Sequence, residues 1–147
     1  IDYEVLTGDE RWQATNIDQI LSQGGELDVF VSISRHKFTM GYAYLKDDID
    51  GISSELSRYA INSRKHHLST RWTLKWSPSV TSSVSYRYAE QDSGYNYNVV
   101  DANIAVAKGR FKLSLSAHNI LNADYTEQNL VPMPKGHALL SLQYQLY

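Results

Sequence analysis

Few residues of this chain have the type and spacing to bind a metal ion. Asp47, Asp48 and Asp50 offer carboxylate oxygens of the kind that Ca²⁺ prefers, but their segment lacks the glycine and the distal glutamate of an EF-hand loop. We interpret this segment as a solvated extracellular loop. His66 and His67 are adjacent in a segment that alternates as a strand does, so their side chains face opposite sides and cannot hold one ion together.

Tyr95, Asn96 and Tyr97 are the candidate ligand-binding residues. They lie in a polar segment, residues 89–97, that we expect to be a long loop. Two tyrosine rings at the tip of a loop could stack on a bulky iron chelate or a corrinoid. Alternatively, they are residues of a membrane interface, or they pack against a neighbouring loop, since tyrosine suits sites with one apolar side and one wet side.

No set of residues in the sequence suggests catalysis. There is no glycine-rich phosphate loop, no G-x-S-x-G motif and no serine with an evident base. The sequence therefore predicts a protein that is not an enzyme, with no catalytic residue, no metal site and no cofactor.

Composition narrows the class of protein. The 147 residues suit one domain, carry a formal charge of −2, and include no cysteine. The charge argues against a basic nucleic-acid-binding surface. The sequence has no apolar run long enough for a transmembrane helix. Tyrosine is abundant, with 11 residues against three Trp and three Phe.

The elements that would carry these residues are strands, because apolar and polar residues alternate along most of the chain. In residues 67–76, Leu68, Trp72 and Leu74 share one face, while Arg71 and Lys75 share the other. The same pattern predicts about eight antiparallel strands joined as an up-and-down meander. Its strands are expected at residues 1–6, 26–33, 38–45, 67–76, 80–88, 99–107, 111–118 and 137–146.

The connections and the strand lengths favour a transmembrane barrel. Short turns are expected at 34–37, 77–79 and 108–110, and long polar loops at 46–59, 89–97 and 118–136. Outer-membrane barrels alternate short periplasmic turns with longer extracellular loops, and their strands cross the bilayer in roughly ten residues. Because a charge such as Arg71 facing lipid would cost about 2–4 kcal/mol, the apolar face is expected to point outward and the polar face into a wet interior.

Several motifs resemble the C-terminal part of TonB-dependent outer-membrane receptors. "NILNADY" (119–125) is similar to the family's "ENLFD-x-x-Y", "PKG" (134–136) to its Pro-Gly-basic segment, and "LSLQYQLY" (140–147) to its last, aromatic-terminated strand. Upstream, "NIDQILSQGGELDV" and "YAINSRKHHLSTRW" resemble two further segments of these receptors, in the same order. The resemblance therefore covers nearly the whole chain, residues 1–147.

The resemblance implies a function and partners. Family members import scarce, bulky nutrients such as ferric siderophores, haem or cobalamin across the outer membrane of Gram-negative bacteria. It implies that this chain supplies about eight of some twenty-two barrel strands, without the plug domain. The implied partners are outer-membrane lipid, the remaining strands and plug, and the TonB complex, which would bind a missing N-terminal part. No nucleic acid is implied.

The pattern of strands alone leaves two other classes of protein open. One is a complete, small, eight-stranded outer-membrane barrel with a structural or adhesion role. The other is a soluble ligand carrier of lipocalin type, in which the apolar face would turn inward. The fragment interpretation predicts open sheet edges, whereas both alternatives predict a closed barrel.

Overall fold

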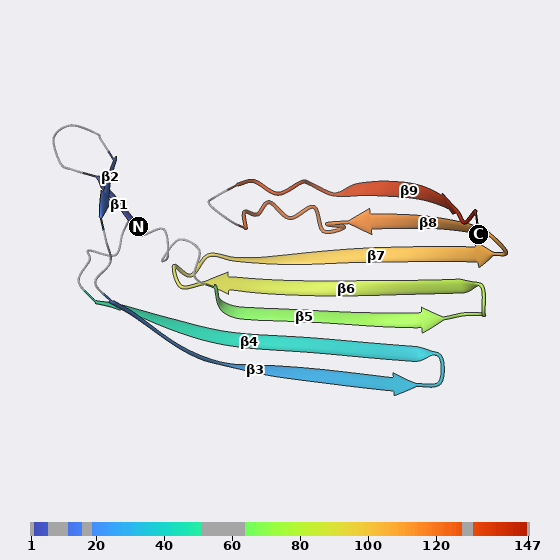
Figure 1. Cartoon of the computed structure of the whole chain (residues 1–147), viewed down its shortest axis with the longest axis horizontal. Helices are drawn as coiled ribbons and strands as arrows, with labels where there is room; N and C mark the ends of the chain where they lie inside the picture. Colours follow the sequence, from blue (N-terminus) through green and yellow to red (C-terminus); the bar gives the residue numbers. More distant parts are fainter. Residues whose placement is uncertain (1, 6–11, 16–18, 51–63, 128–130, 147) are drawn as a thin grey trace.

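The described strands form one antiparallel sheet of seven strands and a separate two-stranded sheet. The computed structural model describes residues 2–5, 12–15, 19–50, 64–127 and 131–146. The sheet follows chain order, so each strand pairs with the next one along the sequence (Figure 1). Its strands are β3 (Gln19–Ile33), β4 (His36–Asp50), β5 (Arg64–Lys75), β6 (Val80–Gln91), β7 (Asn96–Lys108), β8 (Phe111–His118) and β9 (His137–Tyr144).

The prediction of an all-β antiparallel meander is confirmed, with one difference in the strand count. The opening strand, β1 (Asp2–Val5), pairs with β2 (Trp12–Thr15) and not with the sheet. The meander therefore has seven strands, where about eight were expected. No helix long and apolar enough to cross a membrane occurs in the described residues.

The register gives the sheet two chemically different faces. Cross-strand partners share a face, and Val31, Phe38, Trp72, Val84 and Ala102 form one such row across five strands. The face to which this row belongs is called the apolar face. The opposite, polar face carries serine, threonine and charged side chains, among them Thr39, Ser69, Arg71, Ser85, Arg87 and Asp101. The predicted faces of β5 and β6 are thus confirmed.

The turns at one end of the sheet are staggered. Ile33 and His36 flank the β3–β4 turn, at the level of Leu74 on β5. The β5–β6 turn lies two residues beyond this level, and the β7–β8 turn, flanked by Lys108 and Phe111, lies four residues beyond (Figure 1). One residue of stagger per strand, at about 3.3 Å along the strand and 4.8 Å between strands, corresponds to a strand tilt of about 35°. Strands in β-barrels have this tilt.

The apolar residues form a band of limited height. On β7 the band lies between Asn98 and Lys108, ten residues apart (108 − 98), and on β4 between His36 and Lys46, also ten apart (46 − 36). Ten residues inclined by about 35° span about 27 Å. Aromatic rings lie toward both borders of the band: Tyr42, Tyr44, Tyr86 and Tyr88 toward the loop end, and Trp76, Phe111 and Tyr144 toward the turn end.

No other element covers the apolar face in the described part of the chain. Trp72, Ile104 and Leu142 are 45%, 44% and 70% exposed. The chain exposes 10838 Å² in total, whereas a compact monomer of its mass would expose about 7,600 Å². The buried apolar residues that the structure describes form one small cluster at the loop end of the sheet: Ala89, Tyr97, Val99 and Tyr125.

The predicted loop at 89–97 is wrong, and the predicted loop at 46–59 is wrong over residues 46–50. The connection between β6 and β7 is a turn of four residues, 92–95, and not a loop over 89–97, because Gly94 at φ 83° allows the chain to reverse tightly. The Gln91 N–H donates to the Tyr95 carbonyl at 2.8 Å and closes this turn. Asp47 and Asp48 lie in β4 and not in a loop, because β3 and β4 run on past the apolar band; both have 15 residues. Residues 51–63 lie outside the described ranges. The long connection before β9 is present, at 119–136.

Candidate functional site on the polar face

The connection between β8 and β9 folds back over the polar face and is anchored at its start. Asn119 follows β8 with φ 48°, in the left-handed region that asparagine tolerates better than most residues. Its backbone N–H donates to Asp101 Oδ1 at 2.8 Å, and the next N–H, of Ile120, donates to the Val100 carbonyl at 2.8 Å. These bonds turn the chain across β7.

Asparagine side chains hold the two ends of this connection together. Asn119 is buried, its Oδ1 accepts from the Ala123 N–H at 2.8 Å, and its Nδ2 donates to the carbonyls of Ala123 and Pro134 at 2.9 and 3.1 Å. Asn122 Oδ1 accepts from the Gly136 N–H at 3.0 Å. Because the buried amide has all these partners, the connection is held in a defined shape against the sheet.

A stacked tyrosine pair fixes the middle of the connection to the sheet. The Tyr125 ring lies 4.6 Å from the Tyr97 ring of β7, centroid to centroid, and both residues are 5% exposed. Burial raises the pKa of the Tyr125 hydroxyl above its ordinary value; the nearby Arg87 guanidinium opposes this shift and the Glu127 carboxylate adds to it. The Thr126 N–H donates to the Tyr95 hydroxyl at 3.2 Å.

A carboxylate on the connection pairs with arginines of the sheet. Glu127 Oε1 lies 2.9 Å from Arg87 Nη1, and Glu127 Oε2 lies 4.0 Å from Arg64 Nη2. The Tyr97 hydroxyl donates to Glu127 Oε1 at 3.5 Å. The Glu127 side chain is only 19% exposed, so its pair with Arg87 is screened less by salt than a fully exposed ion pair.

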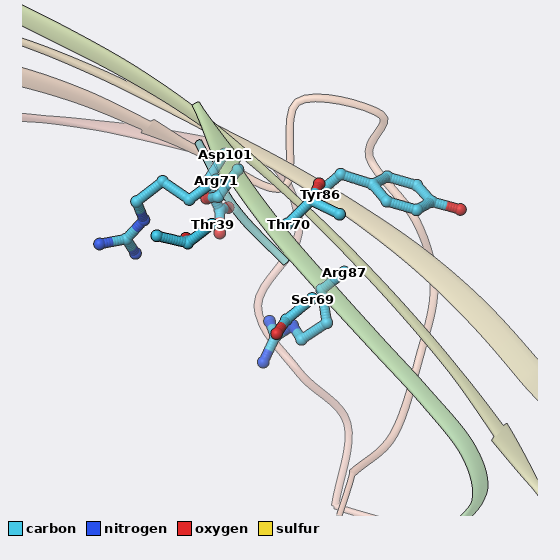
Figure 2. A pocket seen from close by; sticks show the side chains of 8 residues that line it. Thr39, Ser69, Thr70, Arg71, Tyr86, Arg87 and Asp101 are labelled. Atoms are coloured by element: carbon cyan, nitrogen blue, oxygen red, sulfur yellow. The ribbon is translucent and has the colours of Figure 1, made fainter. Parts of the chain in front are cut away.

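A groove of about 490 Å³ lies on the polar face over β4 to β7. Six residues of the polar face contribute side chains to it, namely Ser85 and the five labelled in Figure 2 as Arg71, Arg87, Thr39, Ser69 and Asp101. Thr70 and Tyr86 line it through their backbones, because their side chains belong to the apolar face, and Figure 2 shows the Tyr86 ring pointing away from Arg71. The groove therefore offers two guanidinium groups, three hydroxyls and one carboxylate.

Of the three residues predicted to contact a ligand, the structure keeps the Tyr95 and Tyr97 rings together, with their centroids 6.3 Å apart, and places Asn96 away from them. Tyr95 lies in the 92–95 turn and is 38% exposed. Asn96 is the first residue of β7 and lies on the opposite face from Tyr97, with its Nδ2 donating to the Gly94 carbonyl at 3.3 Å. Since Tyr125 covers the Tyr97 ring, Tyr97 offers no open stacking surface there. Tyr95 stays a predicted ligand contact.

His66 and His67 face opposite sides of the sheet, as predicted. The Tyr42 hydroxyl and His66 Nδ1 lie 2.8 Å apart on the apolar face, whereas His67 pairs with Ala89 on the polar face. Asp47 and Asp48 are likewise neighbours in a strand. In the described ranges, no group of three or more histidine, cysteine, aspartate or glutamate side chains is placed to hold a metal ion.

Sequence reasoning assigned Arg71 to the polar face but missed the arginine and glutamate cluster. Arg87 and Glu127 are 40 positions apart (127 − 87) and meet only because the connection folds over the polar face. A partial signal was present, because Arg71 and Arg87 occur in phase with the serines of their strands. Nothing in the sequence pattern identified Glu127 as their partner.

Comparisons with protein-family models, with curated proteins and with solved structures found no match for this chain.

Proposed function

We propose that this chain forms part of the wall of a transmembrane β-barrel, with its apolar face toward lipid and its polar face toward a water-filled interior. We propose further that the barrel is that of a TonB-dependent receptor in the outer membrane of a Gram-negative bacterium. The observation that carries the proposal is the uncovered apolar band, about 27 Å high and bordered by aromatic rings. Barrels in outer membranes have an apolar band of about 25 Å between two aromatic girdles.

The two faces have the chemistry that this orientation requires. In hydrocarbon, every backbone polar group needs a partner, and the long ladders of β4 to β8 supply one on both sides of each strand. The polar face keeps Arg71, Arg87 and Asp101 away from lipid, where each charge would cost about 2–4 kcal/mol at the midplane. In water, by contrast, the apolar face would be a large contiguous apolar patch, which soluble monomers rarely expose.

The direction of the edge strands argues against closure of the seven described strands by themselves. β3 and β9 are the edge strands, and with five strands between them they run in the same direction. An antiparallel barrel containing this sheet thus needs an odd number of further strands to join β9 to β3. Direct closure of seven strands, or a ring of identical copies, would require parallel pairing at the joint. A lipocalin-type carrier would need the apolar face on the inside, whereas the apolar side chains of the described strands, such as Ile104 and Leu142, are exposed.

The resemblance of the C-terminal motifs to those of TonB-dependent receptors is the second support for this proposal. The "NILNADY" segment, residues 119–125, is the part of the chain that turns inward and packs on the polar face. An inward-folded connection narrows a barrel interior, which suits selective uptake of one bulky solute such as a ferric siderophore, haem or cobalamin. The partners are the remaining strands, the plug and the TonB complex.

The experiment is a growth assay with the gene intact, deleted or complemented. Deletion is expected to abolish growth on one ferric siderophore, haem or cobalamin as the limiting source, and the wild-type gene is expected to restore it only in a tonB⁺ strain. Membrane fractionation accompanies the assay. Recovery of the protein in the aqueous fraction, or growth on every source after deletion, would contradict the proposal.

A further inference from the structure

The polar face already binds one carboxylate, and this carboxylate belongs to the chain itself. Glu127 reaches Arg87 at 2.9 Å and Arg64 at 4.0 Å, with the Tyr97 hydroxyl donating at 3.5 Å. Guanidinium groups bind carboxylates and phosphates with short, charge-assisted hydrogen bonds. The polar face therefore already carries side chains that bind an oxyanion.

The groove next to this ion pair holds a second guanidinium group that has no such partner. Arg71 makes no ion pair or side-chain hydrogen bond with another described residue. Its cross-strand neighbours are Thr39 on β4 and Ser85 on β6, and Arg87 is its diagonal neighbour beyond Ser85. Diagonal neighbours on one face are about 7–8 Å apart, so two guanidinium groups can reach one bound group between them.

We propose that this groove binds an oxyanion, a carboxylate or phosphate group of a solute in the barrel interior, on Arg71 and Arg87, and that Glu127 competes with it for Arg87. The proposal rests on the proposed function, because it takes the polar face as the water-filled side of the barrel. Ser69 and Thr39, which Figure 2 labels, and Ser85 line the same groove, and their hydroxyls supply neutral hydrogen-bond donors.

Two carboxylates near the groove limit the charge of the ligand. Asp101 lines the groove, but its Oδ1 accepts from the Asn119 N–H at 2.8 Å and lies 3.7 Å from His118 Nδ1. Asp28 lies near Ser69, across Gly41, which has no side chain to separate them. A ligand with many negative charges would be repelled by both carboxylates. The groove thus suits a solute that presents one carboxylate or phosphate group and carries hydroxyls.

Competition with Glu127 would couple binding to the shape of the inward connection. Glu127 lies two residues after Tyr125, whose stacking on Tyr97 anchors the connection. An oxyanion that takes Arg87 releases Glu127 and leaves the connection held by the tyrosine pair and by Asn119. Ligand binding is therefore expected to loosen the segment from Asn119 to Glu127.

The test is calorimetric titration of the full-length protein in detergent at low salt. Glycerol 3-phosphate and gluconate are the probes, because they present one phosphate or one carboxylate beside hydroxyls. Arg71→Gln is expected to weaken binding by about 10- to 100-fold, the range for loss of a charge-assisted contact. Lys112→Gln, which removes a cation from the same face outside the groove, is the matched control and is expected to change affinity less than about twofold. Glu127→Gln is expected to tighten binding.

The outcomes separate this inference from the proposed function. Equal losses of affinity in Arg71→Gln and Lys112→Gln would overturn the proposed site. A wild-type protein that binds neither probe would overturn it as well. Unchanged affinity in Glu127→Gln would overturn the competition. If Arg71→Gln does not fold, Arg71→Lys, which keeps the positive charge but not the guanidinium group, is titrated in its place and compared with Lys112→Gln in the same way. Membrane insertion is measured on the same samples, so a protein that inserts but binds neither probe refutes the oxyanion site alone.

Discussion

Val84→Arg places a charge at the centre of the apolar band. Val84 lies midway between Val80 and Tyr88 on the apolar face of β6, and its side chain is 43% exposed. If this face touches lipid, the arginine lies near the bilayer midplane, where it lowers the free energy of unfolding by about 2–4 kcal/mol. The ratio of folded to unfolded protein would then fall roughly 30- to 700-fold.

Ser83→Arg is the matched control, because Ser83 is the adjacent residue on the polar face. Its arginine would point into water, so the free energy of unfolding is expected to change by about 0.5 kcal/mol or less. Both variants are measured by urea unfolding of the full-length protein in phospholipid vesicles. Equal effects of the two substitutions, or a larger loss in Ser83→Arg, would refute the proposed orientation of the faces.

Three further predictions follow from the packing. Gly24→Ala is expected to lower the free energy of unfolding by about 1–3 kcal/mol, because its Cβ would collide with the Tyr44 carbonyl oxygen, whereas Gly25→Ala has open space and is expected to be nearly neutral; urea unfolding compares the two. Asn119→Ala removes three buried side-chain hydrogen bonds, so the following segment is expected to exchange its amide hydrogens at least tenfold faster, and unchanged exchange would contradict its anchoring role. Burial raises the pKa of Tyr125, so its packing is expected to be intact below pH 10 and lost as the pH rises through the higher pKa of the folded state. Tyrosinate absorbance would detect this ionisation, and ionisation of Tyr125 at the ordinary pKa would refute the prediction.

Much of the sheet could be predicted because its constraints are local. Alternation along β5, β6 and β8 fixed which residues share a face, since consecutive strand residues point to opposite sides. The prediction failed where the sequence stopped alternating between apolar and polar. Glu90 and Asn96 were predicted to lie in a loop because the residues around them are polar on both faces. They lie on β6 and β7, which continue beyond the apolar band, and there a strand can carry polar residues on both faces.

The candidate site could not be predicted because it depends on contacts between distant parts of the chain. The sequence gives no means of pairing Glu127 with Arg87, or Tyr125 with Tyr97, across long stretches of chain. The fold of the connection over the polar face is held by the side-chain amide of Asn119, whose partners are Ala123 and Pro134. Only the motif "NILNADY" pointed to this segment, through resemblance and not through physical reasoning.

The most direct test of the account is a spin-label scan along β7, at residues 102–106, in lipid vesicles. Labels at Ala102, Ile104 and Val106 are expected to collide with lipid-soluble oxygen and not with a water-soluble nickel chelate. Labels at Asn103 and Ala105 are expected to show the reverse. A period-two alternation in this sense would support a lipid-facing apolar band, whereas no alternation, or labels at Ile104 shielded from oxygen inside a water-soluble core, would contradict it.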